Sequence, residues 1–187
     1  MAEENNCKRR KRPLHPWEIQ EAKRVFGEGL NYARVRVHEC YSFTDAIDRI
    51  GQRLKGIKNP IVTHNAITLG NHCYFPVTMP EHPVQPADQE HYMISWLIHE
   101  LTHAWQYQKM GWKYLYFALK AQFSLKGKAY DFDGDEGLKR RRREGAKLNQ
   151  FNLEQQGDIC RGYYERICRG QDVSNWQPFI DEIRGKI

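Results

Sequence analysis

The chain has 187 residues, of which 40% are hydrophobic and 28% charged, and it carries a formal net charge of +6. This length and composition favour one globular domain that needs no disulfide staples to hold its core. No apolar run approaches the roughly 18 residues of a membrane-spanning helix. The N-terminus also lacks the apolar segment of a secretory signal peptide. We therefore expect a cytoplasmic protein, or one that leaves the cell by a route independent of such a signal.

The excess positive charge is concentrated in two runs, Lys8–Pro13 and Leu138–Lys147. Such runs can bind nucleic acid or anionic membranes. Runs of charge are more often solvated arms and loops, and we favour that interpretation for both. Nucleic-acid binding is therefore the weaker hypothesis.

The five cysteines carry little signal of a metal site or a disulfide framework. Their number is odd, their spacings are wide and no Cys-x-x-Cys pair is present, which argues against a thiolate zinc site. We expect reduced, partly buried thiols at Cys7, Cys40, Cys73, Cys160 and Cys168.

Apolar periodicity and turn residues define the predicted elements of the first half of the chain. In chain order they are a disordered basic arm over residues 1–13, a helix over 16–26, a half-buried strand over 32–40, a helix over 44–54, and two β-rich segments over 60–70 and 72–80 with a Gly70-Asn71 turn between them. Residues 14–187 are expected to form a single domain.

The second half of the chain is mostly helical. Its predicted elements are a central helix over 88–110 ended by Gly111, a helix over 114–125, a polar loop over 130–145, a long helix over 147–169 and a short helix that starts at Ser174. Strands and helices are segregated rather than alternating, so the sequence predicts an α+β fold. In this fold a small antiparallel or mixed sheet packs on the central helix.

The central helix is the most hydrophobic one, yet it carries two histidines and a glutamate, His99, Glu100 and His103. Positions i and i+4 of a helix share one face, so the imidazoles of His99 and His103 project side by side and can bind one metal ion. Glu100 points to one side of that ion, within reach of a bound water. This is the His-Glu-x-x-His spacing of zinc peptidases, in which the glutamate is the general base. The alternative is an amphipathic helix with two incidental histidines.

A third ligand from further along the chain must be a carboxylate or a cysteine, because no histidine follows His103. Glu154 and Asp158 are the best candidates, since they lie four residues apart and share a helix face. Glu154 would complete three protein ligands and leave a position for water. Asp158 would accept the second ring N–H of a metal-bound histidine. If Glu154 is not the ligand, the next candidates are Asp131, Asp133, Asp135 and His72.

These segments resemble the gluzincin zinc peptidases, in which His-Glu-x-x-His is followed on a later helix by Glu-x-x-x-Asp. AITLGNHCYFP, LIHELTHAWQYQ and NLEQQGDICRGYY together look like the compact metallopeptidase-like domains associated with bacterial contractile injection and type VI secretion systems. The resemblance covers residues 17–170. It implies a minimal zincin-like fold, with Zn²⁺ held by His99, His103 and Glu154.

The resemblance also implies a function, although it does not identify the substrate. We expect a zinc-dependent metallopeptidase with Glu100 as general base, secreted as a bacterial effector or toxin, with a protein or peptide substrate and an immunity protein or a secretion spike component as partner. The alternative is a catalytically inactive zinc-binding or structural domain of a secretion apparatus. Gluzincins stabilise the transition state with a later histidine, which this chain lacks. Candidates for that role are Tyr163, Tyr164, Arg161, Tyr130 and His91.

Overall fold

The computed structural model describes residues 7–41, 65–111 and 133–185. Within these ranges the helices are α1 (Pro16–Phe26), α3 (His91–Met110), α5 (Gly134–Arg143), α6 (Leu153–Cys168) and α7 (Gln177–Ile183), and the strands are β1 (Arg10–Arg12), β2 (Arg36–Glu39), β3 (Ile67–Leu69) and β4 (His72–Tyr74). The helices predicted over 44–54 and 114–125, and residues 1–6 of the predicted arm, lie outside the described residues.

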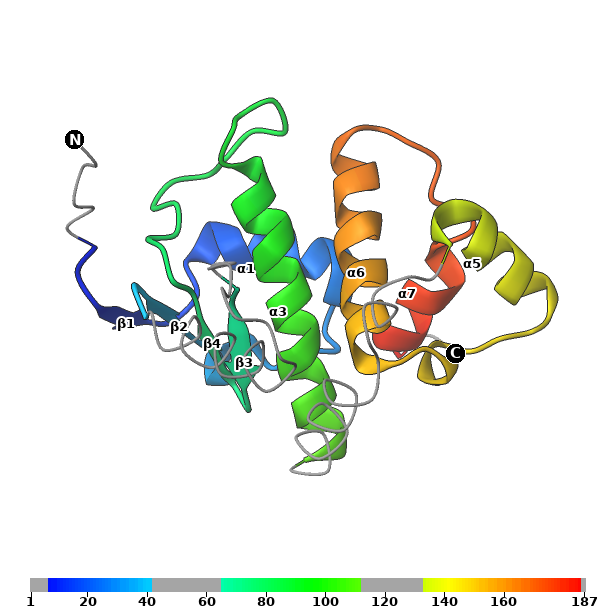
Figure 1. The fold of residues 1–187 in the computed structure, drawn as a ribbon, viewed down its shortest axis with the longest axis horizontal. Coiled ribbons are helices and arrows are strands. Elements are labelled where there is room, and N and C mark those ends of the chain that lie inside the picture. The colour runs from blue at the N-terminus through cyan, green and yellow to red at the C-terminus, as the bar shows by residue number, and fades with distance from the viewer. Residues whose placement is uncertain (1–6, 42–64, 112–132, 186–187) are drawn as a thin grey trace, which may run out of the picture.

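A small mixed sheet in the order β1-β2-β4-β3 packs on α3. β1 is antiparallel to β2, β2 is parallel to β4, and β3 is antiparallel to β4. Figure 1 shows α3 between this sheet and α6, with α5 and α7 beyond α6. The predicted α+β fold is confirmed, and α3 lies at its centre.

The core of the domain gathers around α3, whose apolar residues Ile94, Ile98 and Leu101 are buried. The β3–β4 hairpin lies against the same helix, and Gly70 makes its turn with a φ of +66°. A side chain at this position would be strained, and its Cβ would also meet the Tyr107 ring at 3.4 Å. The Gly70-Asn71 turn predicted from the sequence is therefore confirmed, and its positive φ is the reason for the glycine.

The N-terminal basic run is ordered where the structure describes it, so the expectation of a disordered arm is wrong there. Arg10–Arg12 form β1, which pairs with β2. Arg12 is buried; its Nη1 and Nη2 donate to the Glu18 carboxylate at 2.7 and 2.9 Å, and its Nε donates to Glu39 at 2.6 Å. Removing one partner of such a buried ion pair costs about 3–5 kcal/mol. The carboxylates belong to α1 and β2, which is why the local sequence did not reveal this contact.

Cys7 and Cys40 form a disulfide, so the expectation of reduced thiols is wrong for this pair. The bond joins the segment before β1 to the residue that follows β2, and it therefore holds the edge strand on the sheet. Cys73 and Cys160 are buried free thiols and Cys168 is a partly buried one, as predicted.

The loop predicted over 130–145 is also wrong, because Gly134–Arg143 form α5. Acidic residues occupy the first turn of this helix and arginines the last. Both sets of charges interact favourably with the helix dipole and so stabilise the helix. Leu138 is fully buried, and Asp135 accepts a hydrogen bond from the Trp176 indole at 3.0 Å. An apolar anchor and long-range hydrogen bonds, among them that of the Trp176 indole, thus fix a segment whose charge had suggested a solvated loop.

Three of the predicted helices begin later than expected, and α3 starts at His91 rather than at residue 88. α6 starts at Leu153 because Asn152 caps it by accepting from the Gln155 backbone N–H at 2.9 Å, and Leu148–Gln150 form a separate 3₁₀ turn before it. α7 starts at Gln177 rather than at Ser174. The cap at Asn152 places Glu154 in the first turn of α6.

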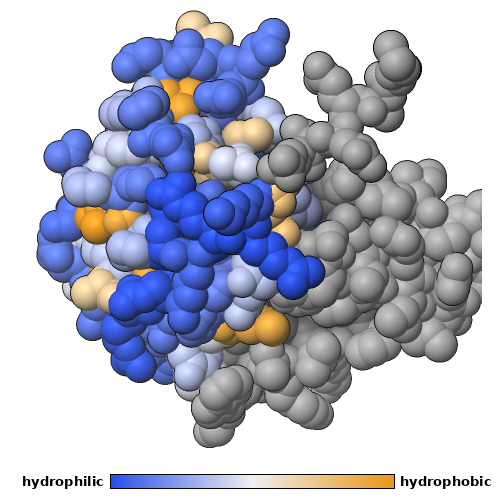
Figure 2. All heavy atoms as spheres, turned by 90° about the vertical axis from the view of Figure 1, so that its left-hand side faces the viewer, coloured by the Kyte–Doolittle hydropathy of each residue, from blue (hydrophilic) through white to orange (hydrophobic). Residues whose placement is uncertain are grey.

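The surface on the β1 side of the molecule is mainly hydrophilic, with small separate apolar areas (Figure 2). Lys8 to Lys11 are exposed there, as expected of a solvated charge run. Within the part of the chain that the structure describes, no helix has the length and apolar character needed to cross a membrane.

We predict that reducing the Cys7–Cys40 bond destabilises the fold. The bond closes a loop with a sequence separation of 33 residues, and a loop of this size contributes about 3–4 kcal/mol in the chain-entropy model. Urea unfolding of the wild-type protein with and without reductant measures the difference. A Cys7→Ser variant is the control, because its stability should not respond to reductant. Equal wild-type stability under both conditions contradicts the role of the bond.

Candidate metal centre

Three side chains from two helices meet at one point between α3 and α6. His99 Nε2 lies 3.2 Å from His103 Nε2 and 3.3 Å from Glu154 Oε2. His103 Nε2 lies 3.5 Å from the same Glu154 oxygen. The predicted ligand set is thus assembled by the fold, and these residues form the group of possible metal ligands found among the described residues.

The spacing of these atoms fits a tetrahedral metal ion. Bonds of 2.0–2.1 Å at tetrahedral angles place neighbouring ligand atoms about 3.3–3.4 Å apart, close to the 3.2, 3.3 and 3.5 Å between the three ligand atoms. Two imidazoles and one carboxylate are also the donor set of catalytic zinc sites, in which a fourth position is left for water or substrate. The residues present therefore fit Zn²⁺.

The local sequence explains how each ligand reaches this point. His99 and His103 are one turn apart on α3, and Glu154 lies in the first turn of α6. Gly157 lies on the same face of α6 as Glu154, and a Cβ there would be 2.7 Å from His99 Cε1. Only a glycine allows the imidazole to lie this close to the backbone of α6.

The electrostatics of the centre match a cation held between carboxylates. Burial opposes protonation of His99, but its hydrogen bonds to Asp158 and Glu154 outweigh burial and raise its pKa to about 10. Burial also opposes protonation of His103, but its pKa is raised because the charge and the hydrogen bond of Glu154, with the charge of Glu100, together outweigh burial. Burial tends to raise the pKa of Glu154, and the two histidines nevertheless lower it. Negative charge thus dominates the centre, so a divalent cation can take the place of the ring protons.

Asp158 lies where the sequence predicted it. Its Oδ1 is 3.1 Å from His99 Nδ1, on the opposite side of the ring from Glu154. A carboxylate that accepts this ring N–H orients the imidazole and raises the basicity of its other nitrogen. Arg161 Nη1 lies 3.8 Å from Asp158 Oδ1, so Arg161 neighbours the centre without touching a ligand.

Sequence reasoning missed two residues that hold functional side chains. Thr68 on β3 donates a hydrogen bond of 2.7 Å to Glu100 Oε2, and both residues are buried. Gln106 Oε1 lies 2.9 Å from His103 Nδ1. Gln106 is three residues after His103 on one helix face, so helical spacing gave a usable signal. Thr68 is 32 residues before Glu100, and no local pattern links the two.

The proposed stabilisers Tyr163 and Tyr164 are not brought to the centre, which corrects that expectation. The Tyr163 hydroxyl donates to Gln177 at 2.9 Å and the Tyr164 hydroxyl donates to Glu21 at 2.9 Å. Tyr163 follows Glu154 by nine residues, a rotation of about 180° on a helix, so it faces away from the ligand. The ring of His91 stacks on Tyr164 with the centroids 5.6 Å apart, while Tyr130 lies outside the described residues.

The alternative third ligands are engaged elsewhere. Asp133 pairs with Arg140, and Asp135 accepts from the Trp176 indole. His72 is 2.8 Å from His38 on the neighbouring strand. Asp131 lies outside the described residues. Of the described candidates, Glu154 is the one that joins the two histidines.

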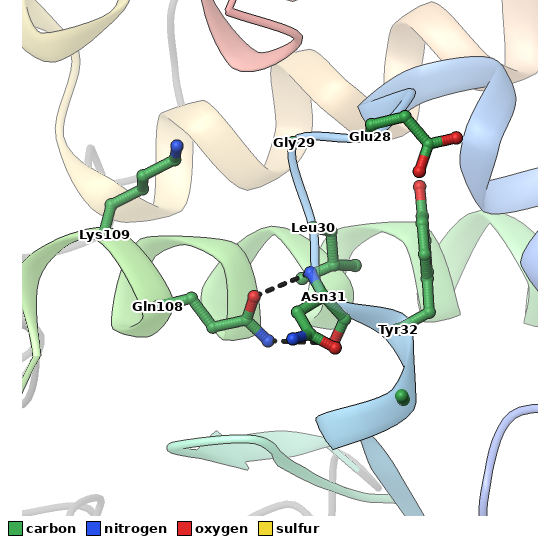
Figure 3. A pocket seen from close by; sticks show the side chains of 8 residues that line it. Glu28, Gly29, Leu30, Asn31, Tyr32, Gln108 and Lys109 are labelled. Carbon is green, nitrogen blue, oxygen red and sulfur yellow. Dashed lines mark hydrogen bonds between the residues drawn. The ribbon is translucent and has the colours of Figure 1, made fainter.

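A surface hollow of about 500 Å³ lies on the far side of α3 from this centre. Figure 3 shows Gln108 reaching across it to Asn31, with two hydrogen bonds drawn between them. Gln108 accepts from the Asn31 backbone N–H at 2.8 Å and donates to its carbonyl at 3.2 Å. Because Gln108 follows His99 by nine residues, it points about 180° away from the metal ligands. The hollow is therefore separate from the candidate centre.

We predict that Glu154→Ala lowers the affinity for zinc at least about 100-fold, because even the loss of a ligand's hydrogen-bond partner costs about 10–100-fold. Competition with a chromophoric zinc chelator measures the change. Glu165→Ala, at a partly exposed ion pair with Arg161 on the same helix, is the matched control and should keep wild-type affinity. Unchanged affinity in Glu154→Ala means that the third ligand is another residue.

Comparison with known proteins gives one informative similarity. No protein-family model and no solved structure matches the chain. The chain is 31% identical over 157 residues, 82% of its length, to the type VI secretion system spike protein VgrG2b of Pseudomonas aeruginosa. It spans about 13% of the length of that protein. The link to type VI secretion that the sequence motifs predicted is thus supported by an independent similarity.

Proposed function

We propose that this chain is a zinc-dependent metallopeptidase of zincin-like architecture, with Glu100 as its general base. The observation that carries the proposal is the meeting of His99, His103 and Glu154 at tetrahedral spacing beside a buried, hydrogen-bonded glutamate. Neither feature alone suffices, since paired histidines also occur in structural sites and buried glutamates in cores.

The ion would polarise the carbonyl of a scissile peptide bond and lower the pKa of water to about 7. Glu100 accepts a proton from the attacking water and passes it to the departing amine. The hydroxyl of Thr68 holds Oε2 of this carboxylate at 2.7 Å and so fixes its direction. The negative charge of Glu100 is also among the causes that raise the pKa of both histidines.

The substrate is proposed to be a polypeptide in extended conformation that lies along β3. This strand ends the sheet order among the described residues, and it carries Thr68, which contacts Glu100. Its neighbour Leu69 is 39% exposed, and Gly70 follows it at the hairpin turn. A peptide that adds to a free strand edge gains main-chain hydrogen bonds without needing a particular sequence. Such binding would place its carbonyls next to α3.

A catalytically inactive zinc domain is the alternative, and the geometry at Glu100 favours the enzyme. A structural zinc site is closed by four protein ligands and has no use for a base. Within the described ranges the centre offers three ligands and a buried carboxylate that is oriented by Thr68. Holding a carboxylate in a buried position without a cation partner is costly, which supports a role for it.

The proposed setting is delivery by type VI secretion as an effector that acts on proteins of another cell. The similarity to a spike protein supports this setting, and the spike itself or an immunity protein would be the partner. The Cys7–Cys40 disulfide supports action in an oxidising compartment, where such bonds persist.

We predict that Glu100→Gln retains zinc but cleaves a peptide identified from a library about 10²–10⁴-fold more slowly, because the amide cannot act as a base. Single-turnover cleavage followed by mass spectrometry measures the rate. Glu90→Gln makes the same chemical change at an exposed residue just before α3 and should leave the rate unchanged. Wild-type cleavage by Glu100→Gln rules out its role as base. A zinc-loaded wild-type protein that cleaves no member of the library supports the inactive alternative.

We also predict that Thr68→Val slows cleavage about 10-fold or more without changing zinc affinity. A hydrogen bond to a charged group contributes about 1.5–3 kcal/mol, and each 1.36 kcal/mol corresponds to a factor of ten in rate. Thr68→Ser keeps the hydroxyl and should restore most of the rate. Equal rates in the valine and serine variants would show that the hydroxyl does not orient Glu100.

A further inference from the structure

Two buried glutamines connect the helices that carry the proposed zinc ligands. Gln106 on α3 is 0% exposed and Gln156 on α6 is 6% exposed. Gln106 Nε2 lies 2.9 Å from Gln156 Oε1, and its Oε1 lies 2.9 Å from His103 Nδ1. Burying an amide costs free energy unless each of its polar atoms has a hydrogen-bond partner. The partners of the two glutamines therefore show which end of each amide is the oxygen and which is the nitrogen.

Backbone carbonyls decide which end of each amide faces its neighbour. A carbonyl only accepts hydrogen bonds, so the atom that faces it must be the amide nitrogen. Gln156 therefore presents Nε2 to the Phe151 carbonyl at 2.9 Å, and its Oε1 is left to face Gln106. Gln106 presents Nε2 both to this oxygen and to the Leu153 carbonyl at 3.0 Å. The orientation of both amides is thus set by the carbonyl of Phe151, just before α6, and by that of Leu153 in its first turn.

This orientation reaches the metal centre through His103. With both hydrogens of its Nε2 committed, Gln106 can offer His103 only its Oε1, which is an acceptor. The Nδ1 atom of His103 must then carry a proton. In the neutral ring Nε2 is consequently unprotonated, and this is the nitrogen that lies 3.2 Å from His99 Nε2 and 3.5 Å from Glu154 Oε2.

The two proposed histidine ligands are held by different chemistry. Asp158 can only accept when ionised, so it fixes His99 without help from other groups. An amide can present either its oxygen or its nitrogen, so Gln106 fixes His103 only because Gln156 and Leu153 fix Gln106. The carbonyl of Leu153 belongs to the residue before Glu154, so the same contacts also tie the carboxylate ligand to α3.

We propose that Gln106 and Gln156 are positioning residues that set the tautomer and orientation of His103 and hold Glu154 in register with it. Neither residue touches the proposed ion or the substrate. The inference rests on the proposed function, because the role given to the two glutamines is to position zinc ligands. The hydrogen bonds from which the role is argued do not depend on whether the chain cleaves peptides.

The first test compares zinc affinities of leucine variants by chelator competition. Gln106→Leu should weaken binding about 10–100-fold, the usual effect of losing a ligand's partner. Gln156→Leu should weaken it less, about 3–10-fold, because Gln106 keeps the Leu153 carbonyl as one of its two restraints. Gln108→Leu is the matched control, since it removes a hydrogen-bonded glutamine from the other side of the same helix and should bind like the wild type.

The second test reads the ring of His103 directly, by nitrogen-15 NMR of the zinc-free and zinc-loaded protein. We expect a proton on Nδ1 that exchanges slowly with water in the wild type, and fast exchange of that proton in Gln106→Leu. The signal of His99 Nδ1–H should persist in this variant. If Gln106→Leu fails to fold, the same comparison is made with Gln156→Leu. Gln156 contacts Gln106 rather than His103, so it tests the same hydrogen-bond chain from one residue further away.

The outcomes separate this inference from the proposed function. A wild-type protein that shows the protected Nδ1 proton on His103 but binds no zinc supports the hydrogen-bond relay and overturns the zinc enzyme. Leucine variants that keep both the protected proton and wild-type zinc affinity overturn the positioning role. A loss of zinc affinity with an unchanged Nδ1 proton overturns the tautomer role and supports only the part played by Glu154 register, since the effect would then not pass through the ring of His103.

Discussion

The contact between the His99 ring and the backbone of α6 at Gly157 is the constraint on which the centre depends. Any Cβ at this position would lie 2.7 Å from the ring carbon Cε1 and 2.9 Å from both ring nitrogens, closer than non-bonded atoms approach. Glycine lets α3 and α6 come together until the ring lies between Glu154 and Asp158, which flank it on the same helix face. With His99 fixed in this way, His103 follows from the helical repeat, since it lies one turn further along α3.

The sheet contributes to the centre from the side of α3 that faces away from α6 (Figure 1). Glu100 faces β3 rather than α6, and Thr68 gives its carboxylate a partner that a purely helical domain would lack. The centre therefore lies where three elements meet, with two candidate ligands on α3, one on α6 and the proposed base oriented by β3. The same strand ends the described sheet, so the element that orients the base is also the one best placed to receive a peptide.

Features that follow from local periodicity could be predicted from the sequence, and features that rest on distant partners could not. The helical repeat was enough to pair His99 with His103 and to place Glu154 and Asp158 on one face, and the structure brings all four together. The ordered N-terminal strand was missed because Arg12 finds its carboxylates on α1 and β2. The same reason applies to the disulfide, to Thr68 and to the helix α5, each of which is fixed by a residue far away in the chain. Tyr163 was misplaced for a local reason, since its distance from Glu154 puts it on the opposite face of α6.

The central claim is that two imidazoles and one carboxylate bind a single zinc ion. X-ray absorption at the zinc edge of the purified, zinc-loaded protein tests it most directly, because the method reports the elements bonded to the metal and their distances. The account predicts only nitrogen and oxygen neighbours at about 2.0–2.1 Å, with scattering from two imidazole rings. Sulfur neighbours at about 2.3 Å, which the free thiols of Cys73, Cys160 or Cys168 would supply, or a folded protein that takes up no zinc, would contradict it.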